Sequence, residues 1–173
     1  MEILATREED WRRLKQVRLA ALLDTPTAFG ASYTAAAAYT ETQWRARAAS
    51  RAGPEFWLAL EGDNPVGMIG GGKDAANRFN LIGLWVKPSL RGSGAAVRLV
   101  ETVKARAIEK GYTHVFLEVS PTNTRAVNFY LRQGFVFYGG VESFRQSSTY
   151  NDTNNGLADK SITLRRSFAQ DNK

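Results

Sequence analysis

The stretch FNLIGLWVKPSLRGSGAAVRLVETV, residues 79–103, joins an apolar run to a second apolar pattern through a turn rich in small residues. Residues 79–87 are almost continuously apolar, which is typical of a strand buried on both faces, and Pro88 ends the run. Arg91 then precedes two glycines and two alanines, and apolar residues at helical spacing continue to about Lys110. The stretch therefore predicts a strand, a glycine-rich turn and a helix in succession.

The small residues of this turn leave the main chain accessible where the helix begins. The first N–H groups of a helix lack intrahelical partners, and the helix dipole adds partial positive charge there. A helix start of this kind binds phosphate groups well. Neither the P-loop pattern nor the dinucleotide-binding G-x-G-x-x-G pattern is present. Taken alone, the stretch is equally compatible with an ordinary loop-to-helix turn.

Helical patterns precede this stretch. Residues 7–23 carry apolar side chains at helical spacing, and Thr6–Glu9 matches a capping box ahead of them. An alanine-rich helix is predicted over residues 32–40. Another helix is predicted over residues 40–50, with Thr40 as its N-cap and a glutamine three residues later.

Further strands are predicted on both sides of the glycine-rich turn, and they cover residues 55–62, 66–72, 111–121, 135–140 and 161–168. A short helix is expected over 123–134, and a long polar loop over 141–160. The strand–helix–strand order around the turn requires a parallel pair, whereas the hairpins before and after it predict antiparallel pairs. The predicted fold class is α/β, a single-domain mixed, mostly antiparallel sheet with a central parallel strand pair and helices on both faces.

Length and composition fit a single folded domain over residues 1–173. The chain is 43% hydrophobic and 23% charged, as ordinary globular domains are, and only the tail near residues 169–173 has a composition that favours disorder. No apolar run approaches 18 residues and the N-terminus lacks a signal-peptide pattern, so we expect a cytoplasmic protein without a membrane partner.

Two residue counts exclude whole classes of site. The absence of cysteine excludes disulfides, thiolate metal sites and a cysteine nucleophile, and a single histidine, His114, excludes a multi-histidine metal site. No metal is therefore expected. The net charge of +6 suits an anionic ligand, a nucleic acid or merely a basic surface. Because basic residues are interleaved with acidic ones and not with aromatic ones, we do not expect nucleic acid as a partner.

Two segments of the chain resemble the GCN5-related N-acetyltransferase (GNAT) superfamily over roughly residues 55–140. Arg91-x-x-Gly94-x-Ala96 resembles the R/Q-x-x-G-x-G/A pyrophosphate loop of that superfamily. The second resemblance is carried by Asn123-x-x-Ala126-x-x-Phe129-Tyr130-x-x-x-Gly134-Phe135. Both segments occur in the strand–loop–helix and strand–helix–strand contexts that the superfamily has.

The resemblance implies acetyl-CoA as the acetyl donor. It assigns the pyrophosphate to main-chain N–H groups of Gly92, Ser93, Gly94, Ala95, Ala96 and Val97. Arg91 would add a charge-assisted contact, and the backbones of Trp85 and Val86 would pair with the pantetheine arm. Splaying of the parallel strands 80–87 and 113–120 would make room for that arm. Asn123 would bind the pantetheine or cap the helix start.

The chemistry of amine acetylation requires a base, an oxyanion donor and an acid. The resemblance gives the donor role to a strand N–H, here that of Val86, and the acid role to Tyr130. Glu118 is the predicted base, because a carboxylate inside an apolar strand is costly unless used and its burial would raise its pKa. A core role for Tyr130 and a solvent-facing Glu118 are the alternatives. Asp24 and Glu41 are spare candidates for the base.

The expected function is transfer of an acetyl group from acetyl-CoA to a primary amine by direct attack in a ternary complex. No cysteine is available for an acyl-enzyme, which agrees with direct attack. The acceptor, a small-molecule or peptide amine, should bind between the N-terminal helices and residues 141–160. The alternatives are a protein N-terminal acetyltransferase of the ribosomal-protein type, a non-catalytic acyl-CoA-binding sensor and a nucleic-acid-binding module. Dimers are common in the superfamily, so the resemblance favours a homodimer.

Overall fold

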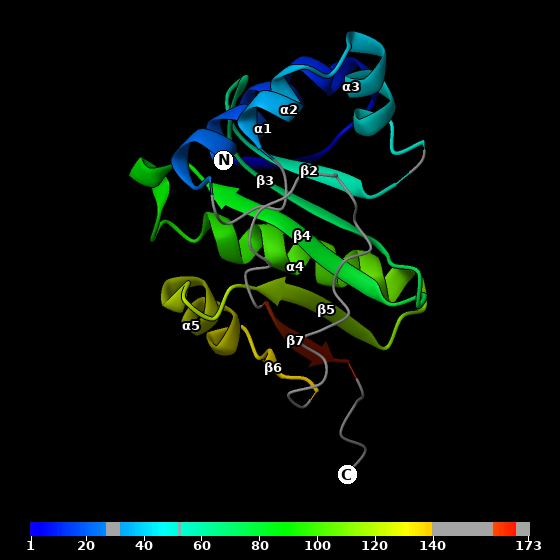
Figure 1. Cartoon of the computed structure of the whole chain (residues 1–173), viewed down its shortest axis with the longest axis vertical. Helices are drawn as coiled ribbons and strands as arrows, with labels where there is room; N and C mark the ends of the chain where they lie inside the picture. The colour runs from blue at the N-terminus through cyan, green and yellow to red at the C-terminus, as the bar shows by residue number, and fades with distance from the viewer. Residues whose placement is uncertain (27–31, 52, 140–160, 169–173) are drawn as a thin grey trace.

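A computed structural model describes residues 1–26, 32–51, 53–139 and 161–168. The strands that it describes are β1 Glu2–Ala5, β2 Glu55–Glu61, β3 Asn64–Lys73, β4 Phe79–Val86, β5 His114–Val119, β6 Val136–Phe137 and β7 Ile162–Ser167. The helices are α1 Trp11–Asp24, α2 Tyr33–Ala37, α3 Glu41–Ala48, α4 Ala95–Glu109 and α5 Thr124–Arg132. Two short 3-10 turns, η1 Glu8–Asp10 and η2 Pro88–Leu90, precede α1 and the glycine-rich turn (Figure 1).

The strands form a single sheet in the order β1-β2-β3-β4-β5-β7-β6. Only β4 and β5 are parallel among these neighbours, and the other pairs are antiparallel, which confirms the predicted fold class. Two features were not predicted. The four-residue strand β1 adds an edge beside β2, and β7 lies between β5 and β6.

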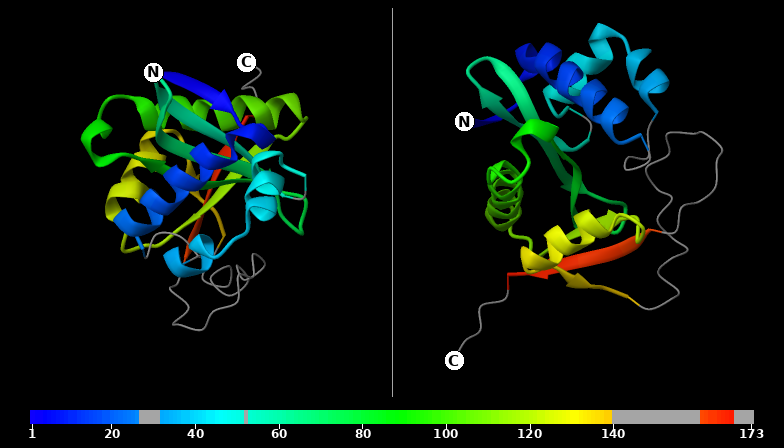
Figure 2. Two further views of the ribbon diagram at one scale, coloured as in Figure 1. Left: turned by 90° about the horizontal axis from the view of Figure 1, so that it is seen from above. Right: turned by 90° about the vertical axis from the view of Figure 1, so that its left-hand side faces the viewer.

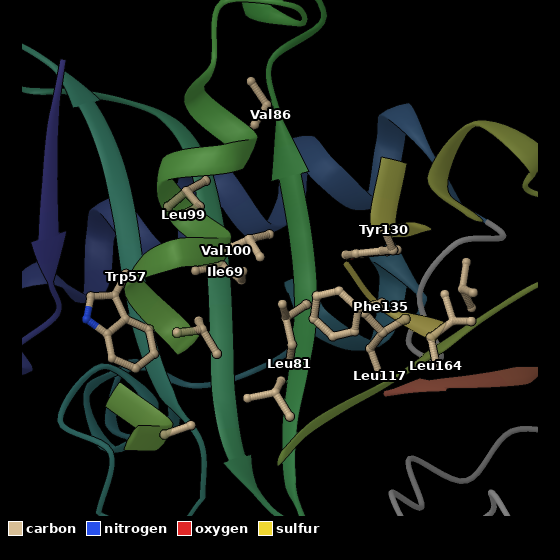
Figure 3. Close-up of a cluster of buried hydrophobic side chains, with 14 of the residues drawn as sticks. Trp57, Ile69, Leu81, Val86, Leu99, Val100, Leu117, Tyr130, Phe135 and Leu164 are labelled. Atoms are coloured by element: carbon tan, nitrogen blue, oxygen red, sulfur yellow. The ribbon is translucent and has the colours of Figure 1, made fainter. Parts of the chain in front are cut away.

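Helices cover both faces of the sheet, as predicted. Helices α1–α3 lie on one face and α4 on the other (Figure 2). The first core, under α1–α3, contains Leu14, Val17, Leu22, Trp44, Leu58, Met68 and Trp85. The second core contains Ile69, Leu81, Val86, Leu99, Val103, Leu117, Tyr130, Phe135 and Leu164 (Figure 3). Helix α5 packs into this second core, on the side of α4.

The predicted helix patterns hold, with one correction. The apolar positions of α1 are all buried, and these are Trp11, Leu14, Val17, Ala21 and Leu22. Thr40 Oγ1 accepts from the Gln43 N–H at 3.2 Å, which confirms the predicted N-cap of α3. The predicted capping box at Thr6 is wrong, because Thr6 Oγ1 donates to Ala48 O at 2.8 Å. Asp10 accepts from the Arg7 N–H at 2.9 Å instead, so the cap lies one residue further along.

Two of the expected features fall outside the described residues, namely the polar loop over 141–160 and the tail near 169–173. Within the described ranges, the helices are too short or too polar for any of them to cross a membrane.

Candidate acetyl-donor and catalytic site

The opening between β4 and β5 is the first component of the site. Their register contains a single pair, Asn80↔Phe116, near the start of β4, and the arrowheads of the two strands diverge (Figure 1). A β-bulge contributes to this divergence, because one residue of β3 between Met68 and Gly70 faces two residues of β4, Gly83 and Leu84.

Gly83 provides the backbone conformation that this bulge needs. Its φ is +61°, in the left-handed region that side chains other than glycine's disfavour. A glycine inside an apolar run is the sequence signal for such a bulge, and our strand prediction did not use it. Because β4 and β5 pair only at Asn80↔Phe116 and a bulge bends the strand that contains it, the predicted splay of the parallel strands is present.

Val86 directs its peptide groups into this opening. Its neighbour Lys87 donates its N–H to Val66 O on β3 at 2.8 Å. Successive residues of a strand direct their N–H groups to opposite sides, so the N–H of Val86 faces away from β3. Val86 O accepts from Arg91 Nε at 3.1 Å, which agrees with this orientation. By the same alternation, Trp85 directs its peptide groups toward β3.

The glycine-rich turn presents unpaired main-chain amides beside the end of β4. Ser93 N–H donates to Leu90 O at 3.2 Å and Ala95 N–H to Ser93 Oγ at 3.4 Å. In the part of the chain that the structure describes, no acceptor binds the N–H groups of Gly92, Gly94, Ala96 and Val97. The turn therefore offers four free donors at the positive end of the α4 dipole.

This turn requires glycine because of its backbone conformation, and not because a side chain would find no space there. Gly92 and Gly94 have φ values of +86° and +87°. A Cβ placed on either residue meets no atom within 4 Å, so the space around both is open. An open turn with free amides suits the diphosphate of a coenzyme A molecule.

Asp24 connects this turn to the first helix. Its carboxylate accepts hydrogen bonds from Trp85 Nε1 at 2.9 Å and from Arg91 Nη2. The Trp85 hydrogen bond, followed by the Arg91 guanidinium, holds the pKa of Asp24 below its usual value. A carboxylate with a lowered pKa is a poor base, so Asp24 does not fit that role. The Arg91 side chain, predicted to contact pyrophosphate, is engaged by Asp24 and Val86 O.

Tyr130 is buried on α5. Its ring makes edge contacts with Phe129 and Phe135, with centroid distances of 5.3 and 5.6 Å. Burial raises the pKa of the Tyr130 phenol, so the hydroxyl stays protonated at neutral pH. No residue of the described chain hydrogen-bonds that hydroxyl. Tyr130 therefore has the core role, and its hydroxyl keeps its proton and has no partner in the described chain.

Glu118 is exposed, so the prediction that it is buried is wrong. Its neighbours Leu117 and Val119 belong to the core that contains Tyr130. Alternation along β5 places Glu118 on the opposite face, and Glu118 is exposed because that face carries no helix of the described chain at this strand. The desolvation that we expected to activate this carboxylate is absent. Glu118 and Tyr130 therefore approach the opening from different faces of the sheet.

Asn123 has the structural role that was one of its two predicted alternatives. Its side-chain oxygen accepts from the Ala126 N–H at 3.2 Å and caps α5. This cap fixes the first turn of the helix that carries Tyr130.

Comparison with known proteins identifies the family. A model described as the acetyltransferase (GNAT) family matches residues 17–135, more than half of the chain. The chain belongs to the GNAT family of acetyltransferases. The match includes β4, the glycine-rich turn and α5, the elements around the opening. The family is one of acetyltransferases, which is the enzyme class predicted from the sequence.

Individual relatives of this GNAT chain are distant or partial. It is 38% identical to N-acetyltransferase 8B of Rattus norvegicus over 88 residues, which are 48% of this chain and 40% of that protein. The fold is similar to that of a GNAT acetyltransferase from Streptococcus pneumoniae, with a TM-score of 0.75, 15% identity and coverage of 97% and 99% of the two chains. A Thermoplasma acidophilum PaiA N-acetyltransferase, solved in complex with coenzyme A, gives a TM-score of 0.64 at 18% identity, with coverage of 97% and 100%.

Two contributions to the site of this GNAT chain were not foreseen in the sequence. The bulge at Gly83 had a sequence signal, whereas the contact between Asp24 and Arg91 joins residues 67 positions apart and had none. No group of three or more histidine, aspartate and glutamate side chains in the described ranges is arranged to hold a metal ion.

Proposed function

We propose that this protein transfers an acetyl group from acetyl-CoA to a primary amine by direct attack in a ternary complex. The observation that carries the proposal is the set of four free amides at the start of α4, next to the opening into which Val86 directs its N–H. Together these groups suit a donor with a diphosphate at one end and an extended amide-containing arm behind it.

The free amides of Gly92, Gly94, Ala96 and Val97 would hold the diphosphate. Val86 O, which has a second lone pair beside the one that Arg91 Nε binds, would accept from the extended arm, and this leaves the Val86 N–H for the thioester. Arg91 would act indirectly, because its guanidinium fixes the end of β4 through Val86 O and the end of α1 through Asp24. Acetyl-CoA supplies the thioester, and these residues would bind and orient it.

Glu118, Val86 and Tyr130 would transfer protons and stabilise charge during the acetyl transfer. An amine with a pKa of about 10.4 is almost fully protonated at pH 7, so a base must first remove a proton. We assign this step to Glu118, directly or through water. The amine nitrogen then forms a bond to the acetyl carbon as the carbon–sulfur bond breaks, while Val86 N–H stabilises the charge on the carbonyl oxygen. Tyr130 would donate its proton to the departing sulfur, and the second proton, which the nitrogen loses as the amide forms, would return the phenolate to the phenol through water.

Two assays test the proposal. A thermal-shift screen compares coenzyme A and acetyl-CoA with NAD and ATP, since a ligand that binds the native state raises the melting temperature. A thiol-release assay then measures turnover with a panel of small amines and short peptides. We expect stabilisation by both coenzyme A forms and thiol release that depends on an amine. Stabilisation by NAD or ATP alone would contradict the proposal.

The same assays separate the alternatives. Turnover restricted to peptide N-termini would identify a protein N-terminal acetyltransferase. Tight acetyl-CoA binding without turnover of any amine would identify an acyl-CoA sensor.

A further inference from the structure

The face of the sheet opposite α4 carries, beside the proposed base Glu118, aromatic and basic side chains that the proposed chemistry does not use. Phe116 of β5 is paired with Arg165 of β7, and Glu118 is paired with Thr163. Alternation places these four side chains on one face of the two strands. The ring of Tyr138, which follows β6, lies 5.2 Å from that of Phe116 in an edge-on arrangement.

Two guanidinium groups stack on this aromatic pair. The Arg165 guanidinium carbon lies 4.5 Å from the centre of the Tyr138 ring, and that of Arg78 lies 5.1 Å from the centre of the Phe116 ring. Stacking on a ring fixes the plane of a guanidinium and leaves its N–H edge available for a planar partner such as a carboxylate.

The two arginines differ in whether their charge is compensated. Arg78 Nε forms an ion pair with Asp74 Oδ2 at 3.0 Å. Arg165 has no ion pair or hydrogen bond within the described chain, and its Nε is a buried donor without an acceptor. The buried Nε is out of reach of a ligand, but the two Nη groups are not buried, and they are the donors that an anionic group can reach.

Arg165 lies close to Glu118, the residue that we propose as the base. Glu118, the proposed base, lies two residues further along β5 than Phe116, toward the end of the opening. Arg165 is therefore the diagonal cross-strand neighbour of Glu118, a separation of about 7–8 Å between backbones. Long side chains bridge part of that separation, so a molecule with an amine at Glu118 and an anion at Arg165 can be small.

We propose that the acetyl acceptor is a small amine that also carries a carboxylate, and that Arg165 binds that carboxylate. This inference depends on the proposed acetyltransferase function and narrows its substrate class to amino acids and related zwitterions. The net charge of +6 supports it, because a basic protein attracts anionic groups and disfavours polycationic amines.

The test uses pairs of acceptors that differ only in the carboxylate, namely free amino acids and the corresponding amino acid amides. The variant is Arg165→Gln. Arg166→Gln is its matched control, because Arg166 is exposed, lies on the opposite face of β7 and donates to Gly134 O. Arg165→Lys keeps the charge without the planar fork, and melting temperatures establish that each variant is folded.

We expect the wild-type protein to prefer the free acids over their amides by about tenfold or more in kcat/KM. Arg165→Gln should reduce this ratio to near one through a higher KM for the acid, with little change in kcat or in the KM for acetyl-CoA. Arg165→Lys should give an intermediate ratio, and Arg166→Gln should keep the wild-type ratio.

Other results would overturn the inference without affecting the proposed function. These are a preference for amides or polyamines, a failure to acetylate any carboxylate-bearing amine, and an unchanged acid-to-amide ratio in Arg165→Gln. If acetyl-CoA neither stabilises the protein nor is consumed with any amine, the proposed function fails and the inference fails with it.

Discussion

Asp24, the last residue of α1, binds Arg91, the residue that opens the glycine-rich turn. The same carboxylate accepts from Trp85 Nε1, and Arg91 Nε donates to Val86 O. Helix α1, the end of β4 and the turn are therefore joined through one carboxylate. We therefore expect a change at Asp24 to affect the groups proposed to hold the acetyl donor.

Asp24→Asn removes the charge of this contact and keeps its shape. We expect the KM for acetyl-CoA to rise about 3- to 10-fold with a smaller change in kcat, because a partly exposed charged hydrogen bond contributes about 1 kcal/mol. Steady-state kinetics with a fixed amine measure both constants. Asp63→Asn is the control, since Asp63 also pairs with an arginine, Arg13, but is fully exposed. An unaltered KM in Asp24→Asn would show that the turn does not depend on this contact.

The pH dependence of stability reports on the same carboxylate. Because the pKa of Asp24 is lowered in the folded state from an ordinary value of 3.8, its ionised form favours folding above that value. The stabilisation is lost as the pH falls from the ordinary value through the lowered one. Melting temperatures of wild type and Asp24→Asn should therefore differ near neutral pH and converge in acid. A difference that stays constant below pH 3.8 would exclude this linkage.

Tyr130→Phe removes the proposed acid and preserves the ring contacts with Phe129 and Phe135. We expect kcat to fall about 100-fold, the usual effect of losing an acid or base, with acetyl-CoA binding retained. Burial raises the pKa of the Tyr130 phenol, so the wild-type enzyme should not lose activity through its ionisation as the pH approaches 10. Tyr112→Phe, at a ring that contacts Phe79 in a tilted arrangement, provides the control for losing a phenol elsewhere. Normal turnover in Tyr130→Phe would assign Tyr130 to the core alone.

Gly94→Ala tests the turn through backbone conformation. Its φ of +87° disfavours alanine, so we expect a loss of about 1 kcal/mol in stability and several-fold weaker acetyl-CoA binding. Gly62, between β2 and β3, also has a positive φ and open space around it. Gly62→Ala should therefore lower the melting temperature by a similar amount without affecting acetyl-CoA binding by calorimetry. Equal binding by both variants would remove the turn from the proposed site.

Glu118→Gln tests the proposed base. We expect at least a tenfold lower kcat/KM for the amine and a flatter acidic limb in the pH–rate profile. Glu61→Gln, at an exposed glutamate ending β2, is the control. Wild-type kinetics in Glu118→Gln would move the base to another group or to water.

Local patterns of the sequence predicted most of the elements. The spacing of Trp11, Leu14 and Val17 identified the buried face of α1, and Thr40 identified the start of α3. The edge strand β1 was missed because four residues with two exposed ends carry little periodicity. The position of β7 between β5 and β6 was missed because strand order is set by tertiary contacts that no local pattern records.

The site was predictable where it depends on the main chain. Small residues between β4 and α4 indicated the free amides, and the motif around Tyr130 indicated α5. The exposure of Glu118 was not predictable, because alternation fixes the face to which a strand residue points and not what covers that face. The partners of Asp24 were not predictable either, since Trp85 and Arg91 lie 61 and 67 residues away from it in the sequence.

The single register pair between β4 and β5 has a mechanical consequence for the whole molecule. Main-chain hydrogen bonds hold β1–β4 together and β5–β7 together, but they scarcely cross between these halves. Helix α4 is the element that contacts both, with Leu99 and Val103 in a core shared with Val115. Helix α4 thus connects two sets of strands, β1–β4 and β5–β7. An extended ligand bound between β4 and β5 would restrict the motion of one set relative to the other.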